Sequence, residues 1–234
     1  MNNLEKMRAT GIVPVVVLED ASNAIQTAKA LLDGDIDVME IALRTDAAME
    51  SIQRVVEGCP EMLVGAGTVL TKEQCEEAIK KGAGFIVSPG FNREVVEYCL
   101  EQQIAVVPGC VTPSEITEAA GMGVKIIKFF PANVYGGLAA MKKLAAPFTD
   151  IRFIPTGGIN QGNLEKYAKV GFVFAVGGSW MCSRKEIAER KFGEITEKCK
   201  VAREAYLGYE VAHVGINTSC GADKQYRCGN CRFE

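Results

Sequence analysis

The regular alternation of short Val/Ile-rich runs with amphipathic stretches constrains the fold of this chain more than any other feature. The strand candidates are residues 12–18, 36–43, 62–67, 84–88, 104–108, 124–130, 151–156 and 172–177. Helix candidates lie between them, among them residues 21–32, 72–81, 94–102 and 137–145. Eight strand–helix units in about 200 residues predict an α/β protein that is a single (β/α)8 TIM barrel over residues 1–205. An open flavodoxin-like sheet is the alternative, but it usually holds fewer units.

Capping patterns mark the start of two of these helices. Thr71 is followed by Gln74, and Thr112 is followed by Glu115, which is the spacing of a capping box. Pro113 would occupy the first helical position, where a missing N–H costs nothing. The sequence therefore predicts helices that begin at residues 72 and 113.

The composition is that of a folded protein without surplus positive charge. Hydrophobic residues make up 48% of the chain and charged residues 24%, with a formal net charge of −3. Nucleic-acid binding needs a basic face, so no nucleic-acid partner is expected. No apolar run approaches the roughly 20 residues of a membrane span, and residues 1–6 lack the apolar core of a signal peptide. We expect a cytoplasmic protein with no membrane partner.

The residue inventory excludes some catalytic machinery. The single histidine, His213, lies near the C-terminus, so Ser-His-Asp and Cys-His catalysis is excluded for the first 200 residues. A general acid or base there must be a carboxylate, a lysine or a tyrosine. Six of the nine cysteines are scattered without metal-type spacing and are expected to be small buried residues of a reducing compartment: Cys59, Cys75, Cys99, Cys110, Cys182 and Cys199.

Lys128 lies inside an apolar run, residues 124–131, where a charged side chain is unusual. Ile126 and Phe130 would share the face of Lys128 on a strand, while Ile127 and Phe129 would face the other side. Apolar residues on both faces indicate a strand of a buried parallel sheet. Because lysine is rarely buried without a partner, and because desolvation favours the neutral amine that attacks a ketone, the sequence predicts Lys128 as a Schiff-base nucleophile.

Glu40 and Arg44 occupy even-numbered positions of the second predicted strand and so share one face. The odd-numbered residues Met39, Ile41 and Leu43 are large and apolar and should face the helices. Glu40 and Arg44 should then face the barrel interior or its mouth, roughly 13 Å apart along the strand, with Glu40 deeper. A buried carboxylate can move protons. An ion pair with Lys128 is the structural alternative, and the two roles are compatible.

Small residues follow four of the predicted strands. Residues 65–68 and 88–90 end the third and fourth strands, where a ligand could approach the backbone. Residues 156–158 and 177–179 end the seventh and eighth strands, each with paired glycines. Loops at these two places form the usual phosphate site of a TIM barrel, because bare N–H groups there bind an anion. The pattern predicts a phosphorylated ligand.

Together these segments resemble the 2-keto-3-deoxy-6-phosphogluconate (KDPG) / 4-hydroxy-2-oxoglutarate (KHG) aldolase family. The resemblance covers residues 5 to 205 in order and spacing and rests on residues 40–45, 65–69, 127–132, 155–159 and 177–180. It implies a class I aldolase, an aldehyde-lyase that cleaves KDPG, KHG or both to pyruvate and an aldehyde through a lysine Schiff base. It further implies a homotrimer of Entner–Doudoroff carbohydrate metabolism, with a 2-oxo acid substrate that is phosphorylated, and with no metal or other cofactor.

The same resemblance implies residue roles. Lys128 would be the Schiff-base lysine and Glu40 the proton shuttle. The pyruvate portion of the substrate would be surrounded by Arg44, Thr68, Pro89 and Phe130. Thr156 would line the site, and the phosphate would be held by Gly157, Gly158, Gly178 and Ser179.

Other functions remain open at this point. The preferred aldehyde is not determined, so 2-dehydro-3-deoxy-6-phosphogalactonate aldolase is one alternative. A phosphate-binding isomerase or epimerase barrel would share the glycine loops, but it leaves Lys128 in its apolar strand unexplained. A ligand-binding or scaffold protein without catalysis is disfavoured, because Lys128, Glu40 and Arg44 would all occupy inward positions.

The resemblance ends at about residue 205, and residues 206–234 are expected to be a short C-terminal extension. Residues 208–217 resemble the opening strand of a glyoxalase-type module, in which the histidine, here His213, is a metal ligand. Cys228 and Cys231 have CxxC spacing, and with His213 and Cys220 they could form a zinc site. The intervals are irregular, so a partly ordered extension without metal is the favoured interpretation.

Overall fold

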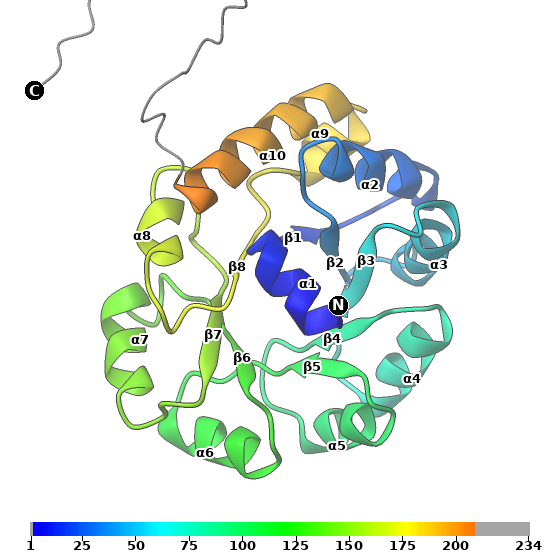
Figure 1. The fold of residues 1–234 in the computed structure, drawn as a ribbon. Helices are drawn as coiled ribbons and strands as arrows, with labels where there is room; N and C mark the ends of the chain where they lie inside the picture. The colour runs from blue at the N-terminus through cyan, green and yellow to red at the C-terminus, as the bar shows by residue number, and fades with distance from the viewer. Residues whose placement is uncertain (1, 209–234) are drawn as a thin grey trace, which may run out of the picture.

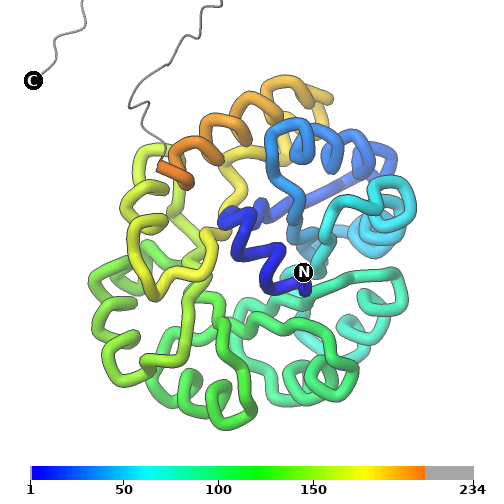
Figure 2. The backbone as a smooth tube through the Cα atoms, in the orientation of Figure 1, coloured from blue at the N-terminus to red at the C-terminus, as the bar shows by residue number. Residues whose placement is uncertain are grey.

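Parallel strands form an inner ring in the structure, a computed structural model that describes residues 2–208 (Figure 1). Eight strands lie in this part of the chain: β1 (Ile12–Val16), β2 (Val38–Ala42), β3 (Leu63–Gly67), β4 (Phe85–Val87), β5 (Ala105–Val107), β6 (Ile126–Phe129), β7 (Arg152–Pro155) and β8 (Val176–Gly178). Figure 2 follows the chain once around the ring, so consecutive strands are neighbours. This is the predicted (β/α)8 barrel.

Single bridges close the ring where the regular ladders end. One sheet has the order β5-β4-β3-β2-β1-β8, and β6 pairs with β7. The bridge between Gly109 and Lys128 joins β5 to β6, and the bridge between Thr156 and Gly177 joins β7 to β8. Lys128 N donates to Pro108 O at 2.9 Å, and Lys128 O accepts from Cys110 N at 2.9 Å. The strand that carries Lys128 is therefore bonded on both sides.

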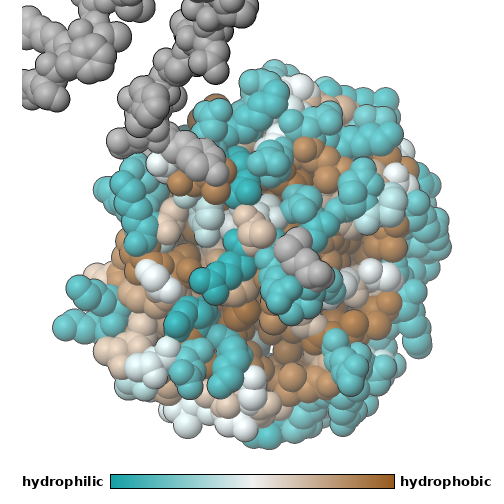
Figure 3. All heavy atoms as spheres, viewed as in Figure 1, coloured by the Kyte–Doolittle hydropathy of each residue, from teal (hydrophilic) through white to brown (hydrophobic). Residues whose placement is uncertain are grey.

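Helices cover the outside of the ring: α2 (Ala24–Leu32), preceded by the short 3-10 helix η1 (Ala21–Asn23), α3 (Ala48–Gly58), α4 (Lys72–Lys80), α5 (Arg93–Glu101), α6 (Pro113–Gly121), α7 (Gly137–Ala145), α8 (Leu164–Ala168), α9 (Arg184–Ala188) and α10 (Phe192–Leu207). The predicted starts at residues 72 and 113 are confirmed, and Thr112 with Glu115 forms a complete capping box. Figure 3 shows mostly hydrophilic outer helix surfaces. No helix within residues 2–208 is long and apolar enough to span a membrane.

The strands separate two apolar cores. The larger core lies between strands and helices, and the six cysteines predicted to be buried are free and buried. The smaller core fills the barrel and includes Val13, Val38, Phe85 and Ile126. An N-terminal helix that the sequence patterns did not reveal, α1 (Asn3–Thr10), closes the end where the strands begin, and its Met7 is fully buried in the inner core (Figure 1).

The eighth strand differs from the predicted residues 172–177. Val173 makes a single bridge to Phe153, and the ladder with β1 starts at Val176 and continues to Gly178. The aromatic pair of Phe153 and Phe172, whose ring centroids are 6.0 Å apart, holds the earlier residues against β7. The apolar run therefore contains two separate contacts, one to each neighbouring strand, rather than one continuous strand.

Residues 209–234 lie outside the described residues. The expected glyoxalase-like opening strand is among them, and so is the zinc alternative that would use His213, Cys220, Cys228 and Cys231. The last helix of the barrel, α10, ends at Leu207, where Gly208 adopts a left-handed conformation with φ of 64°.

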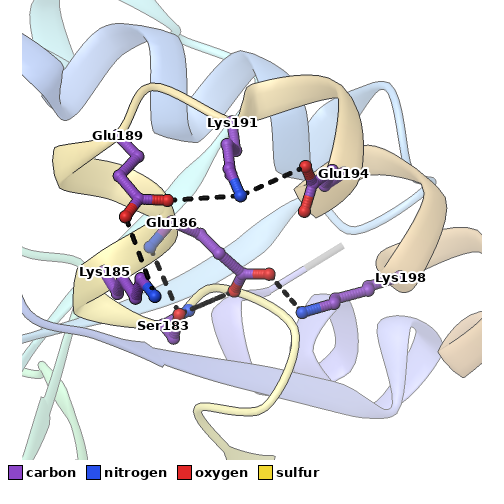
Figure 4. Close-up of polar contacts among 7 residues, drawn as sticks. All are labelled: Ser183, Lys185, Glu186, Glu189, Lys191, Glu194 and Lys198. Carbon is purple, nitrogen blue, oxygen red and sulfur yellow. Dashed lines mark hydrogen bonds and ion pairs between the residues drawn. The ribbon is translucent and has the colours of Figure 1, made fainter.

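Buried Glu186 ties α9 to α10 behind β8 (Figure 4). Its carboxylate accepts hydrogen bonds from the Ser183 hydroxyl at 2.7 Å and from Ser183 N at 3.1 Å, and it pairs with Lys198 of α10. Burial acts to raise the pKa of Glu186, but the hydrogen bonds from Lys198 and Ser183 outweigh it and hold the pKa below its ordinary value. The charged form is thus favoured by folding.

Replacing Glu186 with glutamine is expected to destabilise the fold at neutral pH by on the order of 1 kcal/mol. The wild-type carboxylate contributes this stability above its unfolded pKa, near 4.5, and loses it as pH falls through the lower folded value. Urea unfolding at pH 7 and at about pH 3 should therefore show a difference between the proteins that shrinks in acid. Glu189→Gln, at a more exposed position of the same cluster, is the control. An equal loss at both pH values would contradict the expectation.

Candidate active site

Lys128 and Glu40 meet inside the barrel although their strands lie on opposite sides of the ring. Lys128 Nζ is 3.2 Å from Glu40 Oε1, and the two residues are 5% and 3% exposed. Both come from the interior face of their strands. The neighbours of Glu40, Met39 and Ile41, and the neighbours of Lys128, Ile127 and Phe129, all face the outer core. The inward and outward faces predicted for these residues from the sequence are therefore confirmed.

The pair of Lys128 and Glu40 has apolar side chains on the side of α1 and the barrel mouth on the other side. A small cavity next to the pair is lined by apolar side chains from α1 and the strands, including Met7, Val87 and Ile154. The Phe130 ring, which is 36% exposed at the barrel mouth, has its centroid 5.2 Å from Lys128 Nζ. Apolar side chains therefore shield the pair of Lys128 and Glu40 on the side of α1, and Phe130 borders it at the mouth.

The inward face of β3 has no side chain at two successive positions. A Cβ atom at Gly65 would lie 2.2 Å from the Phe85 ring, and one at Gly67 would lie 2.0 Å from Glu40 Oε1. The sequence suggested that a ligand approaches these glycines. The structure shows instead that side chains from the flanking strands fill the space above them. The two glycines, one residue apart, share the inward face of β3. They leave room for Glu40 of β2 and Phe85 of β4.

Thr156 brings an unused hydroxyl to the same cavity. It directly follows β7, is 6% exposed, and its Oγ1 has no hydrogen-bond partner among the described residues. It also lines the cavity beside Glu40 and Lys128. A Cβ atom at Gly177 of β8 would lie 2.2 Å from Oγ1, so the hydroxyl packs over a glycine. A buried hydroxyl without a partner is costly, which makes it a good contact for a polar ligand atom.

The predicted phosphate loops lie side by side after β7 and β8. Gly157 and Gly158 have φ of 92° and 77°, a region that favours glycine. Gly178 ends β8 and Ser179 follows it at the surface. The Thr156–Gly177 bridge brings the two loops together. The structure therefore places all four predicted residues at the same end of the barrel, after the neighbouring strands β7 and β8.

The remaining predicted residues follow strands β2 to β4 at the same end of the barrel. Arg44 is exposed two residues after β2, and Thr68 directly follows β3 with φ of 59°. Pro89 follows β4, and its carbonyl packs so closely on Gly109 that a Cβ there would lie 2.2 Å away. The C-terminal ends of the strands thus bring together all the residues selected from the sequence, with Lys128 and Glu40 deepest.

Comparison with known proteins gives a consistent result. A family model described as KDPG and KHG aldolase matches residues 4–198. A 2-dehydro-3-deoxy-phosphogluconate aldolase of Treponema pallidum is 45% identical over 193 residues, which are 82% of this chain and 90% of the relative. A KHG/KDPG aldolase of Escherichia coli K12 is 38% identical over 205 residues, 87% of this chain and 95% of the relative.

Solved structures extend the likeness to the fold. A KDPG aldolase from Legionella pneumophila, with pyruvate captured at low pH as a covalent carbinolamine, matches with a TM-score of 0.83 and 36% identity over 86% of this chain and 98% of that one. A native KDPGal structure matches with a TM-score of 0.77 and 26% identity, over 84% and 94% of the two chains.

Proposed function

This chain belongs to the KDPG and KHG aldolase family, and we propose that it is a class I aldolase that cleaves KDPG, KHG or both to pyruvate and an aldehyde. The observation that carries the proposal is the buried pair of Lys128 and Glu40, whose Nζ and Oε1 atoms are 3.2 Å apart inside the barrel. An amine can become a Schiff-base nucleophile only after it loses a proton, and the carboxylate that would take that proton is already in contact with it.

Imine formation uses both members of the pair. A proton moves from the Lys128 ammonium to Glu40, and the neutral amine attacks the C2 ketone to give a carbinolamine. Glu40, now protonated, supplies the proton with which the carbinolamine hydroxyl leaves as water, and the carbinolamine becomes a protonated imine. The apolar cavity limits competing water. The pair that neutralises the buried charges in the free protein thus also performs the proton transfers.

Carbon–carbon cleavage then draws electrons into the imine. Glu40, again a carboxylate, removes the proton of the C4 hydroxyl, and the C3–C4 bond breaks. The electron pair of that bond forms the C2–C3 double bond of an enamine attached to the Lys128 nitrogen. The C4 carbon leaves as the aldehyde. Protonation at C3 and hydrolysis of the resulting imine release pyruvate and restore the amine. The protonated imine is the electron sink, so the proposal includes neither metal nor organic cofactor.

The other residues bind the two ends of the substrate. We assign Arg44, Thr68, Pro89 and Phe130 to the pyruvate portion, because they border the mouth above Lys128. The glycine loops, with Ser179, are assigned to the phosphate, since they lie together after β7 and β8 and since Gly157 and Gly158, with positive φ, leave the backbone there without side chains. Thr156 lies between these groups, and its hydroxyl lacks a protein partner among the described residues.

The gluconate epimer is the proposed sugar-acid substrate. The two relatives described above, one named for phosphogluconate and one for KHG and KDPG, are 45% and 38% identical to this chain, whereas the KDPGal structure is 26% identical. 2-Dehydro-3-deoxy-6-phosphogalactonate remains the competing substrate, and kcat/KM on KDPG, on its galactonate epimer and on KHG decides among them.

The setting of the enzyme is also a proposal. We assign residues 1–205 to the aldolase barrel and residues 206–234 to an extension, supported by the family match to residues 4–198. A cytoplasmic homotrimer acting in Entner–Doudoroff metabolism is proposed on the family resemblance. Free buried cysteines agree with a reducing compartment, and exposed Val134 and Tyr135 are apolar side chains that association would cover. Analytical ultracentrifugation tests the trimer.

Borohydride reduction in the presence of pyruvate tests the mechanism. One reduced pyruvate adduct per chain is expected, and peptide mapping should place it on Lys128, because reduction converts the imine into a stable secondary amine. A phosphate-binding isomerase or a ligand-binding protein would give no adduct. An adduct on Lys125, which is exposed on the opposite face of the strand, would contradict the assignment of the nucleophile.

A further inference from the structure

The Glu40 side chain reaches Lys128 by leaning over β3. Its Cα atom is in register with Gly65 of β3, but its carboxylate lies above Gly67, two residues further toward the mouth. A side chain in a strand commonly leans along the strand direction. Here the lean brings the carboxylate over residue 67, which as glycine has no side chain to block it.

The space above Gly67 is filled by the reacting group itself. A Cβ atom at Gly67 would lie 2.0 Å from Glu40 Oε1, 2.5 Å from Cγ and 2.6 Å from Cδ. Oε1 is the oxygen that contacts Lys128 Nζ at 3.2 Å. Gly67 lies in a regular strand and its φ is outside the left-handed region. Its backbone therefore does not require glycine, and the three nearest atoms that a Cβ would meet all belong to the Glu40 side chain.

We propose that Gly67 is a positioning residue for the aldolase reaction: its missing side chain lets the Glu40 carboxylate lie against the Lys128 amine. The inference rests on the proposed function, since it concerns the proton transfers assigned to Glu40. It adds a residue that does not touch the substrate carbon atoms and that acts through Glu40. The site would thus require a carboxylate at residue 40 and also the absence of a side chain at residue 67.

A methyl group at residue 67 would displace the carboxylate without changing its chemical nature. An ordinary contact between a methyl carbon and an oxygen is well beyond 3 Å, so Oε1 has to move by about 1 Å or more. A displacement of that size in a proton-transfer partner can cost about 10²-fold in rate. The expected signature is a fall in kcat with little change in KM, because the substrate-binding residues at the mouth stay in place.

The decisive experiment compares Gly67→Ala in two backgrounds. In the otherwise wild-type protein, kcat for KDPG cleavage should fall about 10²-fold, and borohydride trapping of pyruvate should slow. In the Glu40→Ala protein, adding Gly67→Ala should change kcat by less than about two-fold, because residues that act as one unit are not additive. Equal losses in both backgrounds, or near-normal kcat in the single variant, would overturn the proposal.

Gly65→Ala is the matched control on the same face of the same strand. The three nearest atoms that its Cβ would meet all belong to the Phe85 ring, the closest at 2.2 Å. Overpacking there should lower the urea midpoint of unfolding, while kcat stays within about three-fold of wild type. A kcat loss as large as that of Gly67→Ala would show that any crowding of β3 impairs turnover, and would overturn the specific role of Gly67.

Folding of the variants keeps the test informative. If Gly67→Ala alone does not fold, the double variant with Glu40→Ala should fold, because the colliding side chain has been removed. Failure of the double variant as well would place the collision elsewhere and end the proposal. Trapping of wild-type protein with pyruvate separates the two levels: no adduct there refutes the aldolase function, whereas a wild-type adduct with an unaffected Gly67→Ala variant refutes the positioning role alone.

Discussion

Lys128→Met is expected to lower kcat/KM for KDPG on the order of 10³-fold or more and to abolish borohydride trapping of pyruvate, because the nucleophile itself is removed. Methionine has a similar length and no charge, so the barrel interior stays filled. Lys125→Met, three residues earlier and exposed on the other face, is the control and should leave both measurements near wild type. Substantial turnover by Lys128→Met would contradict the Schiff-base mechanism.

The same substitution tests the ion pair as a contributor to stability. Lys128→Met leaves Glu40, whose side chain is 4% exposed, without its cationic partner. Removing one member of a buried pair typically costs about 3–5 kcal/mol, whereas replacing both members is often nearly neutral. Urea unfolding should therefore show a large loss for Lys128→Met and a substantial recovery for Lys128→Met with Glu40→Gln. A single variant as stable as the double variant would show that Glu40 finds other compensation.

Glu40→Gln should lower kcat about 10²–10⁴-fold, the range that a positioned general acid–base group contributes, while KM changes little. Glutamine keeps the size of the side chain and the room above Gly67, but it cannot take a proton from the C4 hydroxyl. Steady-state kinetics on KDPG separates kcat from KM, and the rate of adduct formation with pyruvate reports the imine step. Near-normal turnover would make Glu40 a structural partner of Lys128 and would require another proton shuttle.

Local pattern was sufficient to locate the strands and the two central residues. Seven predicted strands lie within a few residues of their observed bounds, because a buried parallel strand needs a continuous apolar run and turn residues on each side. The alternation around Glu40 and Lys128 predicted their interior faces for the same reason. A strand has period two, so the face of each residue follows from that of its neighbours.

Contacts between distant residues decided the rest. The start of β8 was mispredicted because Val173 and Val176 pair with different strands, and that pairing depends on where the ring closes. The helix α1 was not recognised, because a short segment with a single fully buried apolar side chain, Met7, shows little periodicity by itself. Its position depends on the open end of a barrel that forms from later residues.

The strands of the barrel, the inward amine and carboxylate, and the glycine loops at the strand ends could be predicted from the sequence, since each depends on residue types within about ten positions of one another. The contact between Lys128 Nζ and Glu40 Oε1, 88 residues apart in the chain and 3.2 Å apart in space, appears only in the folded barrel. The same is true of the place of the Glu40 carboxylate over Gly67. Distances across a barrel depend on how strands tilt and pack around a shared interior, and the sequence carries that information only through the whole fold.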